Sequence, residues 1–292
     1  MNGVLVIDKP QGLTSHDVVN RVRRILGQRS VGHLGTLDPS ATGVLPVVVG
    51  SFTRLAQFYT HSEKRYEGDI RFGFATSTYD ADGEPITPPQ TVKLEPDQIE
   101  PVAACFRGTL QQMPPPFSAK KIGGVPAYKL ARKGKDVPLK PVQVEIKEFS
   151  ILKVDGDRVT FRAQVGSGTY IRSIAHEMGQ RSGCGAHLAS LRRTAVAEFE
   201  IGDARTLEEL DQAKQKGIAE DLFVHPRKLA PHLPSITATD ETVALIRNGR
   251  AVNLPEMSRA PMVKVFYGQR ELIAIATRIA GTLFHAGIVL TG

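Results

Sequence analysis

Residues 32–43 read Gly-His-Leu-Gly-Thr-Leu-Asp-Pro-Ser-Ala-Thr-Gly and run directly into the apolar segment 44–49. Asp38 is the one charged residue of this loop, which contains Gly35 and ends at Gly43. The residue before a proline is disfavoured in the helical conformation, so Asp38-Pro39 is expected to be extended or to form a turn. A carboxylate held in this way can be presented rigidly to a ligand. The alternative is an ordinary Asp-Pro turn before a strand.

The segments on either side of this loop predict strands and a helix. Apolar residues favour strands at 3–7 and 44–49. Between them, apolar residues recur at helical spacing over 16–26, and Thr14 or Ser15 can cap the start of that helix. The loop therefore lies between a helix and a buried strand.

Farther along the chain, strand and helix patterns alternate irregularly. Strands are predicted at 64–73, 142–154, 159–165 and 186–199, and helices at 53–59, 96–106, 170–181 and 206–217. Because these elements do not follow a strict βαβ order, the predicted fold class is α+β, with a mostly antiparallel mixed sheet flanked by helices.

Three prolines, at positions 226, 231 and 234, predict a domain boundary. Beyond them the sequence indicates a short helix at 240–247 and three strands. The predicted organisation is one domain over residues 1–230 and a small β-rich domain over residues 231–292.

The positive charge of the chain is concentrated in one segment. The net charge is +7 and the pI is about 9.4. Residues 117–140 contain seven cations and one anion, a net +6 that leaves +1 for the rest of the chain; the cations are Lys120, Lys121, Lys129, Arg132, Lys133, Lys135 and Lys140. The interleaved aromatic residues and glycines favour a mobile basic flap that closes over a phosphate backbone. A solvated surface loop is the alternative.

The sequence lacks the motifs that several classes of chemistry need. His176-Glu177 is not followed by the second histidine of a zinc-protease helix, and no Cys-x-x-Cys motif is present. No glycine-rich loop ends in Gly-Lys-Ser/Thr, so nucleotide hydrolysis is not expected. No run approaches the roughly 20 apolar residues of a membrane span, and residues 4–7 are too few for a signal-peptide core. We therefore expect no metal, no cofactor, no membrane partner and a cytoplasmic protein.

Residues 35–45, Gly-Thr-Leu-Asp-Pro-Ser-Ala-Thr-Gly-Val-Leu, resemble the catalytic-aspartate motif of the TruB family of pseudouridine synthases. Three more stretches match that family in the same order: residues 9–15, residues 64–66, and residues 168–172 leading on to 183–188. The resemblance implies an isomerase with the pseudouridine synthase fold that converts the T-loop uridine of tRNA into pseudouridine. It also implies that residues 231–292 form a PUA-like RNA-binding domain.

The resemblance implies a role for each matching residue. Asp38 is expected to be the catalytic carboxylate, with Arg172 as its cation and Tyr170 beside the reacting base. The remaining roles are stacking on a flipped base by Tyr66, substrate contacts by His33, Leu191, Lys64 and Tyr170, and bracing of the catalytic loop by Lys9 and Pro10. From the residues alone, a structural salt bridge for Arg172 and half-buried packing for the tyrosines stay open.

Three alternatives to a stand-alone enzyme remain. The chain could serve chiefly to bind and fold tRNA, or it could be a guide-RNA-dependent synthase. A glycosidase is the third, although it usually needs two carboxylates at one site. The resemblance favours a monomer that needs no protein partner and grips the T-arm of tRNA with residues 117–140.

Overall fold

The computed structural model describes residues 1–118, 120–131 and 138–290. The chain divides into two compact units. The first comprises Met1–Asp38, Val44–Thr60 and Glu198–Gly292, and the second comprises Pro39–Gly43 and His61–Ala197. Asp38 is therefore the last residue of a segment of the first unit.

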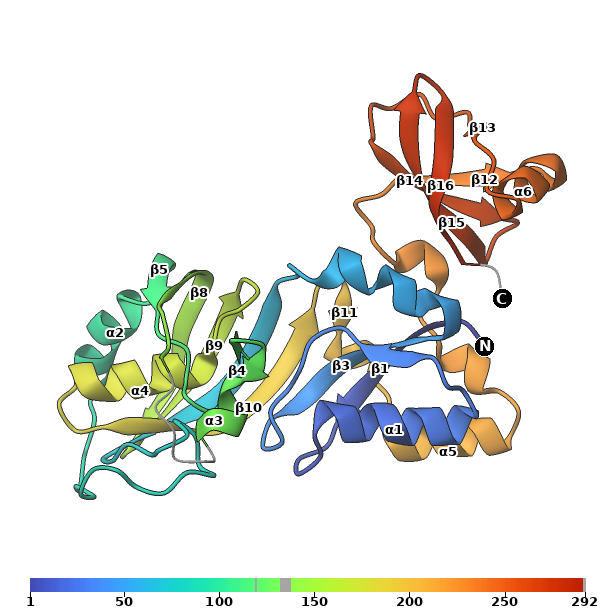
Figure 1. Ribbon diagram of the computed structural model, residues 1–292. Helices are drawn as coiled ribbons and strands as arrows, with labels where there is room; N and C mark the ends of the chain where they lie inside the picture. Colours follow the sequence, from blue (N-terminus) through green and yellow to red (C-terminus); the bar gives the residue numbers. More distant parts are fainter. Residues whose placement is uncertain (119, 132–137, 291–292) are drawn as a thin grey trace. The chain divides into compact units, whose positions relative to one another are not determined.

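One part of the first unit combines three N-terminal strands with two helices, of which the second comes from much later in the chain. Strand β1 (Gly3–Lys9) neighbours β3 (Thr42–Val49), which also pairs antiparallel with β2 (Val31–His33). Helices α1 (Ser15–Leu26) and α5 (Leu207–Gln215) lie side by side along these strands (Figure 1). Their apolar faces share one buried core with the strands.

Helix α1 begins and ends where the local chemistry predicts. The Thr14 side chain accepts a hydrogen bond from the Asp17 N–H, and the Asp17 carboxylate accepts one from the Thr14 N–H, which is a capping box. Gly27 ends the helix in the left-handed region, with φ of +67°. The helix predicted over residues 16–26 is thus confirmed.

Short helical turns connect the rest of the first unit. The helix predicted at 53–59 is a 3₁₀ helix over Gly50–Tyr59, and further 3₁₀ turns cover Ile201–Asp203, Ala219–Leu222 and Pro226–Lys228. The two-residue strand β11 (Phe199–Glu200) directly precedes the turn at Ile201–Asp203.

The C-terminal part of the first unit is a five-stranded sheet with its own core. The strand order is β12-β14-β15-β16-β13, with bounds Ser235–Ala238, Met262–Tyr267, Glu271–Ala280, Leu283–Val289 and Val252–Asn253. Helix α6 (Asp240–Arg247) contributes Ile246 to that core, which includes Val263 and Phe284. The predicted β-rich C-terminal sheet is confirmed, although β12 and β13 were not expected from the sequence.

The second unit is built on an antiparallel sheet. Its strand order is β10-β4-β9-β8-β5, with bounds Ala186–Val196, Lys64–Phe72, Arg158–Val165, Val142–Asp155 and Gly108–Gln112. Helices α2 (Pro96–Ala104) and α4 (Ile171–Arg181) lie along it (Figure 1). The α+β class with a mostly antiparallel sheet is confirmed; parallel pairing joins Thr42 and Gly43 to β10, and β12 to β14.

The segment between β5 and β8 contains a small hairpin and one helical turn. These are β6 (Lys121–Ile122), β7 (Val125–Pro126) and α3 (Ala127–Ala131). Within the ranges given above, no helix is both long enough and apolar enough to cross a membrane.

Candidate functional site

One hydroxyl group attaches the Asp38 loop to the start of helix α1. The Ser15 Oγ atom accepts a hydrogen bond from the Leu37 N–H at 2.8 Å and donates one to the Leu37 carbonyl at 3.0 Å. Both peptide planes of Leu37 are thereby fixed, and its side chain is buried. Asp38 follows directly and is half-buried. The anchor therefore fixes the backbone that enters Asp38.

Gly43 ends this loop where no other side chain fits. Its φ is +99°, and a Cβ atom on it would lie 2.2 Å from the Arg193 carbonyl oxygen. Because glycine has no Cβ, Thr42 and Gly43 can run parallel to β10 opposite Arg192 and Arg193.

Lys9 is fully buried at the end of β1. Its Nζ atom donates hydrogen bonds to the carbonyl oxygens of Pro10 at 2.9 Å and Leu13 at 2.7 Å. Pro10 itself is exposed and takes part through its backbone. These contacts hold the turn that leads into the Thr14 cap of α1. Their predicted bracing of the Asp38 loop stays a prediction.

Replacing Lys9 tests how much this anchor stabilises the fold. Lys9→Met keeps the apolar stem but leaves two partly buried carbonyl groups without this donor, and a fully buried unsatisfied group costs roughly 1–3 kcal/mol. We expect urea denaturation to show a lower free energy of unfolding than in Lys216→Met, a change at an exposed position. Equal stabilities for the two variants would contradict the anchor.

Strands β4 and β10 carry two residues of the predicted substrate site. Tyr66 is 7% exposed and lies in register with Ala163 on one side and Arg193 on the other. Leu191 of β10 lies opposite Gly68 of β4 and is partly buried. The two residues thus belong to adjacent, paired strands.

Lys64 begins strand β4 in a partly buried position. Its Nζ atom donates a hydrogen bond to the Ser62 carbonyl at 2.6 Å. Burial lowers the pKa of Lys64 to about 8, and the nearby positive charge of Arg193 acts in the same direction. Lys64 therefore loses its proton closer to neutral pH than an ordinary lysine.

This shift predicts a pH dependence of stability. Between about pH 8 and the ordinary lysine value of 10.5, the unfolded chain holds a proton that the folded chain has lost, so the free energy of unfolding rises with pH. Below pH 8 both states are protonated and the effect is constant. We expect Lys64→Met to lack this rise, which is of the order of 2 kcal/mol. Denaturant titrations from pH 7 to 10.5 measure it, and Lys93→Met, whose side chain is 85% exposed, is the control. Parallel pH profiles for wild type and Lys64→Met would contradict the prediction.

Arg172, in the first turn of α4, is buried among oxygen atoms. Its guanidinium donates to the Thr78 carbonyl at 3.1 Å and the Phe117 carbonyl at 3.0 Å, and it forms an ion pair with the Asp80 carboxylate at 3.4 Å. The Arg172 and Asp80 side chains are 7% and 9% exposed. The salt bridge that the sequence left open for Arg172 therefore exists.

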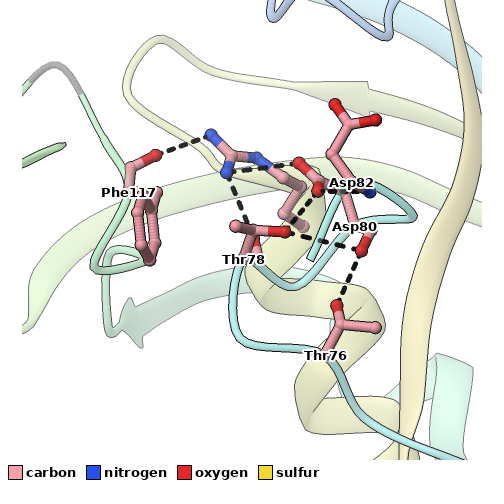
Figure 2. A network of polar contacts seen from close by, with 6 residues as sticks. Thr76, Thr78, Asp80, Asp82 and Phe117 are labelled. Atoms are coloured by element: carbon pink, nitrogen blue, oxygen red, sulfur yellow. Dashed lines mark hydrogen bonds and ion pairs between the residues drawn. The ribbon is translucent and has the colours of Figure 1, made fainter. Parts of the chain in front are cut away.

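Asp80 is itself held by short polar side chains, as Figure 2 shows. The Thr78 hydroxyl and the Asp82 N–H donate to its carboxylate, and the Thr76 hydroxyl donates to its carbonyl at 2.6 Å. Burial raises the pKa of Asp80, while Thr78 and Arg172 oppose that shift. The ionised form of this carboxyl therefore destabilises the folded protein, and the ion pair with Arg172 offsets part of that destabilisation.

The sequence analysis missed Thr78 and Asp80. Both lie in residues 76–83, Thr-Ser-Thr-Tyr-Asp-Ala-Asp-Gly, a stretch for which the sequence analysis predicted no helix or strand. Tyr79 in that turn has φ of +67°, a left-handed conformation that is uncommon for a tyrosine. The dense run of short polar residues was the available signal.

Tyr170 is the N-cap residue of α4 and is half-buried. Its backbone N–H donates to the Gln112 side chain at 2.8 Å, and its carbonyl accepts from the same side chain at 3.1 Å. Tyr170 and Arg172 thus stand two residues apart at the start of one helix, Tyr170 held through its backbone and Arg172 through its side chain.

The predicted site residues fall into two groups. Tyr66, Lys64, Tyr170, Arg172 and Leu191 belong to the second unit. The first unit holds the others: Asp38, Lys9, Pro10 and His33, the last at the end of β2 opposite Val47. The pairing of Asp38 with Arg172 would join the two groups, and it stays a prediction.

The basic segment over residues 117–140 is described in part. Lys120, Lys121, Lys129 and Lys140 lie within the described ranges, and the Lys120 ammonium donates to the Lys140 carbonyl at 3.4 Å. Arg132, Lys133 and Lys135 lie outside the described residues. The predicted flap stays a prediction.

Two family models match this chain. The N-terminal domain of TruB family pseudouridylate synthases matches residues 23–171, and the C-terminal domain of tRNA pseudouridylate synthase B matches residues 172–233. The border between the two matches lies between Ile171 and Arg172, so Tyr170 falls in the first match and Arg172 in the second.

Curated relatives and solved structures agree with these matches. A protein of Solibacter usitatus named tRNA pseudouridine synthase B is 48% identical over 99% of this chain and 100% of its own length. One of Geobacter sulfurreducens with the same name is 43% identical over 85% of this chain and 82% of its own. A chain from an H/ACA RNP bound to a substrate RNA containing 2′-deoxyuridine superposes with a TM-score of 0.73 at 25% identity, covering 99% of this chain and 85% of that one. The chain therefore belongs to the TruB family of pseudouridylate synthases, which are isomerases.

Proposed function

We propose that this chain is a tRNA pseudouridine synthase that isomerises the T-loop uridine of tRNA. The observation that carries the proposal is the relationship to the Solibacter usitatus tRNA pseudouridine synthase B, 48% identical over 99% of the chain. The reaction breaks the bond between ribose C1′ and uracil N1 and forms a bond between C1′ and C5. It involves no net oxidation and no net hydrolysis, so it needs no external oxidant, reductant or energy source.

Asp38 is the proposed catalytic carboxylate. An ionised carboxylate near the glycosidic bond can act as a nucleophile or a base. In a dry site it stays ionised only if a cation or hydrogen-bond donors favour the charged form. We assign that role to Arg172, and the buried Asp80 carboxylate with the Thr78 carbonyl would hold Arg172 in place. The Ser15 anchor on Leu37 supports a fixed position for Asp38.

The uridine must leave its loop to reach this carboxylate. Flipping a base costs a few kcal/mol, and stacking on an aromatic ring returns about 1–3 kcal/mol. Tyr66 is the proposed stacking partner, and its burial in β4 supports a fixed ring position. Tyr170 would lie beside the base, with His33, Leu191 and Lys64 contributing further substrate contacts.

The basic segment and the C-terminal sheet are the proposed grip on the T-arm. Residues 117–140 would contact phosphate groups, which supply much of the affinity for nucleic acids. Residues 231–292 would act as a PUA-like RNA-binding domain beside a catalytic domain of residues 1–230. An enzyme that holds the T-arm while a base is flipped would also assist tRNA folding. Its proposed substrate places the protein in the cytoplasm.

A guide-RNA-dependent synthase is the second candidate, because solved structural neighbours come from H/ACA RNP complexes. We favour a stand-alone monomer, since the Solibacter usitatus relative is 48% identical to this chain and the H/ACA RNP neighbour 25%.

Incubation with an unmodified tRNA transcript separates these candidates. The purified chain, without guide RNA, partner protein or added cofactor, is expected to convert one uridine of the T loop, mapped by chemical labelling of pseudouridine and sequencing. Conversion only after addition of a guide RNA would favour the second candidate. Tight binding without conversion would leave only RNA binding and folding.

A further inference from the structure

Two adjacent glutamines at the end of β5 differ sharply in their surroundings. Gln111 is exposed, whereas Gln112 is 2% exposed. Successive side chains of a strand point to opposite faces, which explains the difference. A buried amide needs hydrogen-bond partners, and those of Gln112 lie on Tyr170.

The Gln112 side chain bridges the backbone of Tyr170. Its Oε1 atom accepts from the Tyr170 N–H at 2.8 Å, and its Nε2 atom donates to the Tyr170 carbonyl at 3.1 Å. These bonds fix the peptide planes on both sides of the Tyr170 Cα atom, where φ is −103° and ψ is 109°. The Tyr170 side chain itself makes no capping hydrogen bond to the first turn of α4. These two bonds therefore constrain the direction in which the Tyr170 side chain leaves the backbone.

The residues after Gln112 are attached to the same helix turn. The Ser173 hydroxyl donates to the Met113 carbonyl at 2.7 Å, and the Arg172 guanidinium donates to the Phe117 carbonyl at 3.0 Å. Three residues at the start of α4, namely the cap Tyr170, Arg172 and Ser173, thus hold the segment 112–117. This segment leads directly into the basic segment.

We propose that Gln112 is a positioning residue of the isomerase, which acts by fixing Tyr170. The inference rests on the proposed function, because the role of Tyr170 comes from it. A displacement of about 1 Å at a reacting centre can lower a rate by roughly 10²-fold. Gln112 is well placed to prevent such a displacement, since it holds Tyr170 on both sides and is closed off from water.

Gln112→Met removes both hydrogen bonds at nearly constant volume, and Gln111→Met is the matched control on the exposed face. We expect Gln112→Met to lower kcat by roughly 10- to 100-fold, with KM for tRNA changed by less than about threefold, because RNA contacts stay in place. Gln111→Met is expected to match the wild type. Should Gln112→Met fail to fold, Gln112→Glu has the same shape, keeps the acceptor for the Tyr170 N–H and serves the same kinetic test.

Fluorine NMR of 3-fluorotyrosine-labelled protein supplies a readout that does not depend on activity. The Tyr170 resonance is assigned by its absence in Tyr170→Phe, and we expect it to move or broaden in Gln112→Met but not in Gln111→Met. An unchanged kcat together with an unchanged Tyr170 resonance would overturn the inference. If the wild type makes no pseudouridine, the proposed function fails, while a moved resonance would still show that Gln112 positions Tyr170.

Discussion

Asp38→Asn is expected to abolish pseudouridine formation while leaving the fold and tRNA binding intact. The amide has the same shape as the carboxylate but carries no charge, so it can act neither as a nucleophile nor as a base. Loss of a central catalytic group lowers kcat by roughly 10⁴-fold or more. Asp38 is only half-buried, and the Ser15 anchor contacts Leu37 rather than Asp38. We therefore expect little change in stability.

Single-turnover conversion of an unmodified transcript at saturating enzyme measures this effect without a contribution from binding. Filter binding of the same transcript checks that affinity is preserved. Asp97→Asn makes the same chemical change on the exposed surface of α2 and is expected to convert at the wild-type rate. Conversion by Asp38→Asn within a few-fold of wild type would refute the assigned role.

Arg172→Met is expected to lower both stability and activity. A second substitution, Asp80→Asn, separates the two losses. Removing one partner of a buried ion pair typically costs roughly 3–5 kcal/mol, because the other charge is left unpaired. Asp80 would be that charge, since its side chain is 9% exposed and pairs with Arg172 at 3.4 Å. Adding Asp80→Asn to Arg172→Met removes the stranded charge and should restore part of the stability.

The double variant is expected to regain stability without regaining activity. If Arg172 also keeps Asp38 ionised, the double variant regains folded protein but not turnover. The measurements are urea denaturation and single-turnover conversion for wild type, both single variants and the double variant. A double variant that recovers turnover along with stability would reduce Arg172 to a structural role.

Local chemistry explains what the sequence predicted well. The bounds of α1 follow from the Thr14–Asp17 capping box and from Gly27, all of which act within a few residues. The β8–β9 hairpin follows from alternating apolar residues on either side of Asp155-Gly156. Motif resemblance, rather than periodicity, singled out Arg172 and Tyr170.

Contacts between distant segments explain what the sequence did not predict. Asp80 looks like any acid in a turn until Arg172, far along the chain, is brought against it. Gln111 and Gln112 are the same residue type, and the one that faces the distant Tyr170 is buried. Strand β12 is four residues long and pairs in parallel with a distant strand, so it has little local signal.

A crystal structure of the protein bound to a T-arm RNA would test the central claim most directly, namely that Asp38 forms one site with Tyr66, Tyr170 and Arg172. We expect a carboxylate oxygen of Asp38 within about 4 Å of the Arg172 guanidinium, the usual limit for an ion pair, with the flipped uridine between Asp38 and the Tyr66 ring. An Asp38 side chain directed into solvent, with the uridine still stacked in its loop, would contradict the claim.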